Sequence, residues 1–297
     1  MATRSLPVVP DRLPLGPDSV YWKVNSELGI FAGGGRALLM QVAHPGVGAG
    51  VEQHSSYAAD PWGRFFRTVD VMMKLSFGTP EQSARQQRML EKMHRRVKGN
   101  TDLGRSYDAN AVDLQMWVWA TLVDTALVVY ERIRPHLGRA ERAQYYEESK
   151  LMAYGCGVPV GACPEGFEDF GRYVERVVAE ELEVTRSARA VAAAAMSLPV
   201  PGRLGLIAAP PHQLITIGLL HPSLREQYGF DWGRAKQCQL DLTLAAGRAA
   251  STVLPTPLRR LGATITLNRD KPLRVPWLQR RGAEMTGQRL DEAGFAS

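Results

Sequence analysis

The chain has 297 residues, of which 45% are hydrophobic and 22% are charged. This length can bury a large core in one or two domains, and the composition is that of a globular protein, neither disordered nor membrane-embedded. The net charge is +6, but acidic residues are mixed with the basic ones and no basic run carries interleaved aromatics. We therefore expect no nucleic-acid partner.

The N-terminal residues 1–17 contain prolines and scattered charges where a signal peptide requires an apolar core. We expect no export and a cytoplasmic protein. Three cysteines without a Cys-x-x-Cys pair fit a reducing compartment and argue against structural zinc. Cys156 lacks the preceding pattern that cytochromes P450 use around a haem-ligating cysteine, so we expect it to be a buried thiol.

Glycine and proline divide the first part of the chain. Residues 19–31 read as a short helix, and the glycines at 33–35 read as a tight turn where two helices meet closely. Residues 36–44 continue as a helix that Pro45 stops. The glycine-rich residues 46–50 are expected to form a tight, adaptable link.

Residues 60–99 predict two consecutive helices that carry most of the chemistry. The first helix begins at Asp60-Pro61, with a cap residue before a proline, and ends at Gly78. The second begins with a capping box of Thr79 and Gln82, and we expect it to continue to Gly99.

Helical spacing assigns side chains to faces of these two helices. One face of the first helix carries Arg64, Arg67, Thr68 and Val71, and another carries Phe65, Val69 and Met72. The second helix has an apolar stripe of Leu90, Met93, His94 and Val97. A histidine in such a stripe is either a hydrogen-bonded core residue or a ligand-binding one.

Residues 110–134 form the longest predicted helix, about 37 Å at the usual rise per residue. Its apolar run at 116–130 is interrupted by Asp124 and is shorter than a membrane span requires, so we expect a central core helix and no membrane span. Trp117 and Trp119 are expected mainly to pack in that core.

The remaining elements are also helical. Helices are expected over residues 139–154, 164–196, 212–228 (interrupted near His221-Pro222) and 231–253. We find no repeat and no alternating run long enough to build a sheet. Three segments follow: an extended lead (1–18), one large helical domain (19–254) and a Pro/Arg-rich segment (255–297) that wraps the body or forms a solvated tail. The fold class is all-α.

Six ordered motifs in the first half of the chain resemble a family that includes the latex-clearing rubber oxygenases and the oxygenase B enzymes of mycophenolic acid biosynthesis. They are GGRALLMQVAHP (34–45), EQHS (52–55), RFFRT (64–68), HRRVKG (94–99), YDA (107–109) and WVWAT (117–121). The resemblance implies an all-α protein that binds haem b through one histidine and uses dioxygen to cleave hydrophobic, often isoprenoid, chains.

The resemblance also assigns residues. It places His94 as the proximal iron ligand, and Arg64 and Thr68 beside the haem, with Arg36 of the first motif counted among the haem-binding residues. Arg67 stands where rubber oxygenases carry a lysine that can cap the iron, so a lysine-capped resting state is not expected. In the family the region of His44 and His54 helps wall the haem pocket, and His54 is the preferred candidate to contact bound dioxygen.

Three functional classes follow. The first is a haem b oxygenase that acts with dioxygen on a hydrophobic unsaturated or aromatic small molecule, with His54 and Arg67 as candidate catalytic residues. The second is a haem protein that senses or stores haem without turnover. The third is a di-iron site, because Glu91 and His94 form a Glu-x-x-His; it fails because no other histidine follows a glutamate at that spacing.

Overall fold

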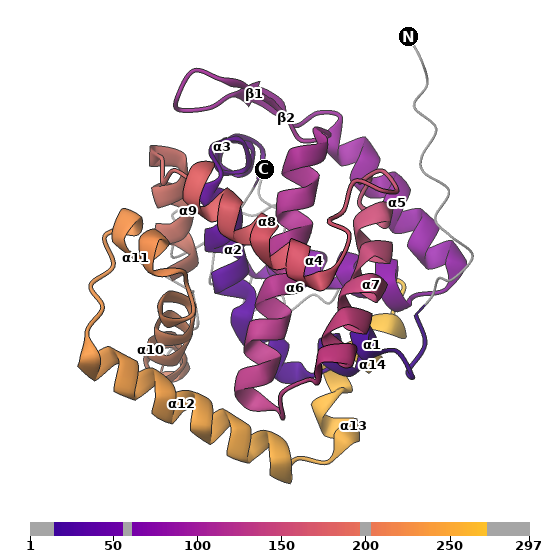
Figure 1. The fold of residues 1–297 in the computed structure, drawn as a ribbon, viewed down its shortest axis with the longest axis vertical. Helices are drawn as coiled ribbons and strands as arrows, with labels where there is room; N and C mark the ends of the chain where they lie inside the picture. Colours follow the sequence, from indigo (N-terminus) through magenta and orange to yellow (C-terminus); the bar gives the residue numbers. More distant parts are fainter. Residues whose placement is uncertain (1–14, 56–60, 197–202, 272–297) are drawn as a thin grey trace.

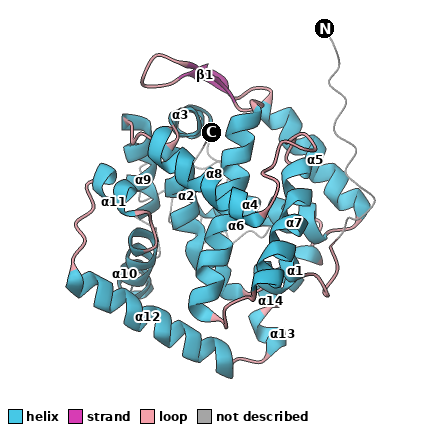
Figure 2. Cartoon of the chain, viewed as in Figure 1, coloured by secondary structure: helices cyan, strands magenta, loops and turns pink. Residues whose placement is uncertain are grey.

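The computed structural model describes residues 15–55, 61–196 and 203–271. Figures 1 and 2 show that these residues form helices and one short hairpin of strands, which confirms the all-α class. The elements are α1 Val20–Asn25, the 3-10 helix η1 Leu28–Gly33, α2 Gly34–Ala43, α3 Pro45–His54, α4 Pro61–Phe77, α5 Pro80–His94, β1 Lys98–Asn100, β2 Ser106–Asp108, α6 Val112–Ile133, α7 Arg139–Gly155, α8 Phe167–Glu180, α9 Arg186–Met196, α10 Arg203–Gly218, α11 Pro222–Tyr228, α12 Arg234–Val253, α13 Thr256–Arg259 and α14 Leu261–Leu267.

Helix α6 is the central core helix, as its composition predicts (Figure 1). Trp117 and Trp119 are buried, and their indole nitrogens donate to the carbonyl oxygens of Met40 and Ser149, each at 3.0 Å. By length and composition alone α6 could cross a membrane, which corrects the expectation drawn from the shorter run at 116–130. However, 67% of that apolar window is buried inside the fold, which is where a helix that is apolar all round belongs.

The glycine-rich residues 46–50 form half of α3, so the expectation of an adaptable link is wrong. Pro45 occupies the first turn, and the His44 side chain caps the helix by accepting from the Gly46 backbone N–H. The expected turn at 33–35 is also absent, because η1 runs directly into α2. The glycines serve close packing: a Cβ at Gly48 would lie 2.5 Å from the carbonyl oxygen of Val42.

Three predicted helices have different boundaries in the structure. The first, 19–31, is α1 followed by η1. The helix predicted to run from Thr79 to Gly99 ends at His94, because residues 98–100 instead pair antiparallel with residues 106–108. Strands of three residues are too short for alternation to reveal them. The predicted helix at 164–196 is two helices, since Leu182 and Val184 turn into the core between α8 and α9.

The C-terminal segment is not a solvated tail over residues 256–267, where α13 and α14 form and α14 packs against α4 and η1. Arg259 forms a largely buried ion pair with Glu27 at the start of η1. This ion pair and the α14 contacts hold the described part of the segment on the body. Arg260 and Arg269 of the segment are described as well, whereas Arg274, Arg280, Arg281 and Arg289 lie outside the described residues.

We expect Gly48→Ala to lower the free energy of unfolding by about 1–3 kcal/mol, because its methyl group meets backbone on α2 that cannot yield. The control is Gly171→Ala in α8, where a Cβ meets nothing within 4 Å and the better helix propensity of alanine should stabilise by up to about 1 kcal/mol. Urea unfolding measures both. Equal effects of the two changes would contradict the packing role given to Gly48.

Candidate functional site

A cavity of about 200 Å³ lies between α4 and the elements α1, η1, α2 and α6. We call it cavity 1. Most of its wall is aliphatic or aromatic, and polar groups reach it from Tyr21, Gln41 and Ser76. The cavity therefore suits a largely apolar ligand with a few oriented polar contacts.

Helix α4 supplies one whole side of cavity 1. Its contributing residues are Arg64, Phe65, Thr68, Val69, Met72, Met73, Ser76 and Phe77. Spacing placed Arg64 and Thr68 on a different face from Phe65, Val69 and Met72, yet all five line the cavity. Arg67 and Val71, which were predicted to share the face of Arg64, do not line it. Arg64 and Thr68 are joined directly, since the Thr68 hydroxyl donates to the Arg64 carbonyl oxygen at 3.0 Å.

The guanidinium of Arg64 is the unusual group in this wall. Burial lowers its pKa to about 10, and the nearby charge of Arg67 acts in the same direction. It stays charged at neutral pH, and its Nη1 donates to the Ser55 hydroxyl at 2.7 Å. Within residues 15–55, 61–196 and 203–271 no carboxylate forms an ion pair with it. A buried charge is costly unless it is paired, so this end of cavity 1 favours an anionic group.

Three other buried cations show the contrast, because each has a carboxylate. Lys74 pairs with Asp70 at 2.7 Å, one turn apart on α4. The Arg36 guanidinium pairs with Asp124 at 2.7 Å and also donates to the Thr125 hydroxyl and to a backbone carbonyl. The third is Arg259 with Glu27. Arg36 thus has protein partners for its charge, and the structure gives it a role in joining α2 to α6.

His94 is the last residue of α5 and is half-buried. Burial lowers the pKa of its imidazole, and the charge of Asp108 opposes that shift. The ring is therefore neutral at pH 7, which is the form that binds a metal. The apolar stripe predicted around it is partly wrong: Met93 is 50% exposed, and Val97 lies beyond the helix end, packed against Tyr107 of the strand hairpin.

His94 does not line cavity 1, yet it belongs to the same helical hairpin as Arg64. Helices α4 and α5 join through Gly78 and Thr79, and the Ser83 hydroxyl donates to the Leu75 carbonyl oxygen at 3.1 Å. Arg64 lies eleven residues before Leu75, and His94 lies eleven residues after Ser83. Both residues therefore belong to the ends of the two helices that lie away from the turn at Gly78 and Thr79.

The other two candidate histidines lie apart from cavity 1. His54, in the last turn of α3, is exposed, and its Nε2 is 3.1 Å from the Lys98 carbonyl oxygen. His44 caps the start of α3, and burial lowers the pKa of its imidazole. Ser55, next to His54, makes the contact with Arg64 and so links α3 to the wall of cavity 1.

Comparison with known proteins identifies the family. Residues 21–267 match the family described as ER-bound oxygenase mpaB/B'/Rubber oxygenase, catalytic domain. The chain belongs to this oxygenase family. Two uncharacterized proteins, from Mycobacterium bovis and Mycobacterium tuberculosis, are each 28% identical over 225 residues, which cover 73% of this chain and 87% of either relative. No solved structure matches the chain.

Membership of the oxygenase family supports oxygenase activity in general, with a small-molecule substrate and dioxygen. Burial raises the pKa of the Cys156 thiol to about 12. A thiol with that pKa stays protonated at neutral pH and is a poor metal ligand. The expectation of a buried, inert Cys156 is thus consistent with the structure.

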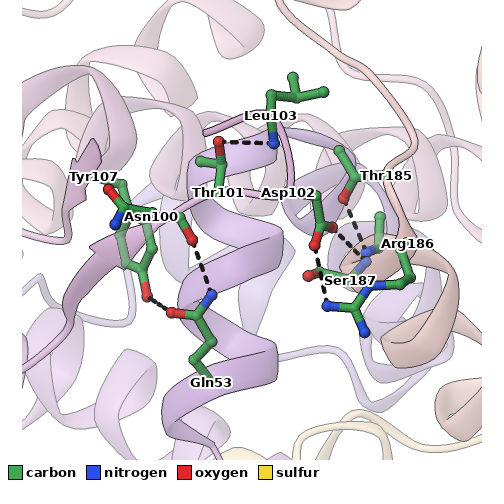
Figure 3. A network of polar contacts seen from close by, with 10 residues as sticks. Gln53, Asn100, Thr101, Asp102, Leu103, Tyr107, Thr185, Arg186 and Ser187 are labelled. Atoms are coloured by element: carbon green, nitrogen blue, oxygen red, sulfur yellow. Dashed lines mark hydrogen bonds and ion pairs between the residues drawn. The ribbon is translucent and has the colours of Figure 1, made fainter. Parts of the chain in front are cut away.

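Sequence reasoning missed the strand hairpin, which polar contacts join to α3 and to the start of α9 (Figure 3). Gln53 on α3 accepts from the Tyr107 hydroxyl at 2.8 Å and donates to the Asn100 carbonyl oxygen at 2.9 Å. In the loop between the strands, Asp102 accepts from the backbone N–H of Ser187 at 2.7 Å and thereby caps α9. Glycine at 104, with φ of 74°, was the one local signal for this turn.

The capping carboxylate of Asp102 gives a pH-dependent prediction. Its pKa is lowered, chiefly by the Ser187 N–H, so its stabilising effect is complete above the unfolded-state pKa near 4 and is lost as pH falls through the folded-state value. We expect Asp102→Ala to lower the free energy of unfolding by about 0.5–2 kcal/mol at pH 7.

Thermal unfolding at pH 7 and pH 3 measures this effect, with exposed Asp18→Ala as the control. The difference in melting temperature between wild type and Asp102→Ala should be smaller at pH 3 than at pH 7. A difference of the same size at both pH values would contradict the capping of α9 by the charged Asp102 carboxylate.

Proposed function

We propose that the chain is a haem b-dependent oxygenase that uses dioxygen on a hydrophobic unsaturated or aromatic small molecule. The observation that carries the proposal is the half-buried Arg64 guanidinium, which has no carboxylate partner among the described residues and lies in the wall of an apolar cavity. A haem is a largely apolar macrocycle whose propionates are anionic. A buried guanidinium is a suitable partner for such a carboxylate.

The residues present fit this cofactor. His94 would supply a nitrogen ligand to the haem iron, because its imidazole is neutral and half-buried at the end of α5. Arg64 would hold a propionate, and Thr68 would border the macrocycle one turn along the same helix. Bound haem iron supplies the redox chemistry that lets dioxygen react with an alkene or an electron-rich ring.

Cavity 1 would hold the substrate, apart from the end where Arg64 would hold a haem propionate. Its volume of about 200 Å³ is below the range of roughly 300–1,000 Å³ usual for drug-sized ligands, so it suits a small molecule or one segment of a chain. Phe31 and Phe65, with ring centroids 6.1 Å apart, help to exclude water from it. Gln41 can orient a polar atom of the ligand. Arg67 and His54 remain proposed catalytic residues, and a cytoplasmic location remains proposed as well.

Replacing the proposed axial ligand tests the cofactor assignment. We expect His94→Ala to fold and to retain less haem than wild type after purification from haem-supplemented cells, because the nitrogen donor is lost. Absorbance in the Soret region relative to that at 280 nm measures retention. His54→Ala is the control and should keep its haem. If His54→Ala lost haem while His94→Ala kept an unchanged spectrum, the ligand assignment would be wrong.

Arg64→Ala tests the anionic partner. A hydrogen bond to a charged group is worth roughly 1.5–3 kcal/mol, so haem should dissociate about 10- to 150-fold more readily from this variant. Transfer of haem to excess apomyoglobin measures the dissociation. The control is Arg85→Ala, which removes an exposed arginine of α5. Matching transfer rates for the two variants would remove the reason to place Arg64 against a propionate.

Turnover separates an oxygenase from a haem sensor or store. We expect the reduced protein to bind carbon monoxide readily and to consume dioxygen when a hydrophobic unsaturated or aromatic substrate is added. An oxygen electrode with a panel of isoprenoids and phenols measures uptake. A reduced form that refuses carbon monoxide and takes up no dioxygen with the whole panel would favour the non-catalytic alternative.

A further inference from the structure

A second cavity of about 260 Å³ lies under α12, against α6, α10 and η1. We call it cavity 2. Its apolar lining includes Val129, Ile133, Ile215 and Leu244. None of the residues assigned above to the oxygenase site lines it, so cavity 2 requires its own explanation.

The polar side chains that line cavity 2 already have partners inside the protein. Arg259 and Glu27 form an ion pair, and the other guanidinium nitrogens of Arg259 donate to the Leu254 carbonyl oxygen and the Thr256 hydroxyl. The hydroxyls of Thr243 and Ser251 donate to backbone carbonyl oxygens at 2.8 and 2.6 Å. A ligand in cavity 2 therefore finds apolar surface and no free cation to hold a carboxylate.

The rim of cavity 2 is apolar and open to solvent. Leu28 and Leu254 belong to its lining and are 50% and 43% exposed. Nearby in the chain, Leu258 and Leu261 are also about half exposed. Aliphatic side chains held in water at the mouth of an apolar cavity mark an entrance for a hydrophobic ligand.

One thin element separates the two cavities. Cavity 2 is lined by the η1 residues Leu28, Gly29 and Ala32 and by the cap residue Glu27. Cavity 1 is lined by the remaining η1 residues, Ile30, Phe31 and Gly33. A ligand in cavity 2 therefore lies one 3-10 helix away from the proposed substrate site.

We propose that cavity 2 is a binding site for an uncharged hydrocarbon chain, which enters past Leu28 and Leu254. The partnered polar groups set the chemical class, since they leave a ligand only apolar contacts. The site goes beyond the proposed function because binding there requires neither haem nor turnover.

The test is titration of the full-length protein with diphenylhexatriene, an uncharged hydrocarbon whose fluorescence rises in apolar surroundings. Gly247→Leu fills cavity 2, since a Cβ at Gly247 lies 3.6 Å from the Ile133 side chain, an ordinary contact. Ala246→Leu adds the same side chain to the exposed neighbouring position of α12. Binding at cavity 1 is common to both variants, so the difference between them reports cavity 2.

We expect Gly247→Leu to weaken probe binding at this site about tenfold or more, because excluding two methylene groups already removes that much binding free energy. Ala246→Leu should bind as wild type does. If Gly247→Leu does not fold, Ala32→Leu fills the cavity from the opposite wall. Superimposable titrations of wild type and both α12 variants, or no probe binding by wild type, would overturn the proposal, whatever the outcome of the oxygenase assays.

Discussion

A charged guanidinium held inside an apolar wall constrains the candidate site more than any other single interaction. Desolvation of the half-buried Arg64 guanidinium lowers its pKa to about 10, and its Nη1 donates to the Ser55 hydroxyl at the end of α3. Desolvating such a charge is costly, and the cost is offset when an anion shares the site. The fold therefore carries a cationic position that a bound carboxylate would complete.

The rest of the scaffold keeps that position in place. On α4, Lys74 has its own carboxylate in Asp70, so the helix holds one satisfied cation in the core and one cation at the cavity. Ser55 reaches Arg64 from the end of α3, and α3 is fixed on α2 and α9 by close glycine contacts and by the strand hairpin that Gln53 holds. Apolar core packing around α6 supports all of these elements.

Capping and spacing patterns in the sequence correctly predicted the parts of the fold that depend on interactions between residues close in the chain. The capping box of Thr79 and Gln82 fixed the start of α5, and both of its hydrogen bonds are present. The end of α5 depends on pairing between residues 98–100 and 106–108, which spacing in the helix cannot reveal. Glycines such as Gly48 misled the prediction, because their role is a tertiary contact with α2 and not a flexible link.

The sequence predicted which residue types form the site, but not which of the arginines would have a carboxylate partner. Spacing placed Arg64 and Thr68 together, as the structure does, but it could not distinguish Arg64 from Arg36, whose carboxylate comes from α6. The resemblance chose the family correctly, and residues 21–267 match it. Cavity 2 had no sequence signature, because its lining comes from elements far apart in the chain.

The most direct test of the account is the haem content of the protein purified from cells supplied with a haem precursor, measured as the pyridine haemochrome. The account predicts close to one haem b per chain, with a Soret band in the native spectrum. Folded protein that contains no haem b, even after addition of haem in vitro, would contradict it.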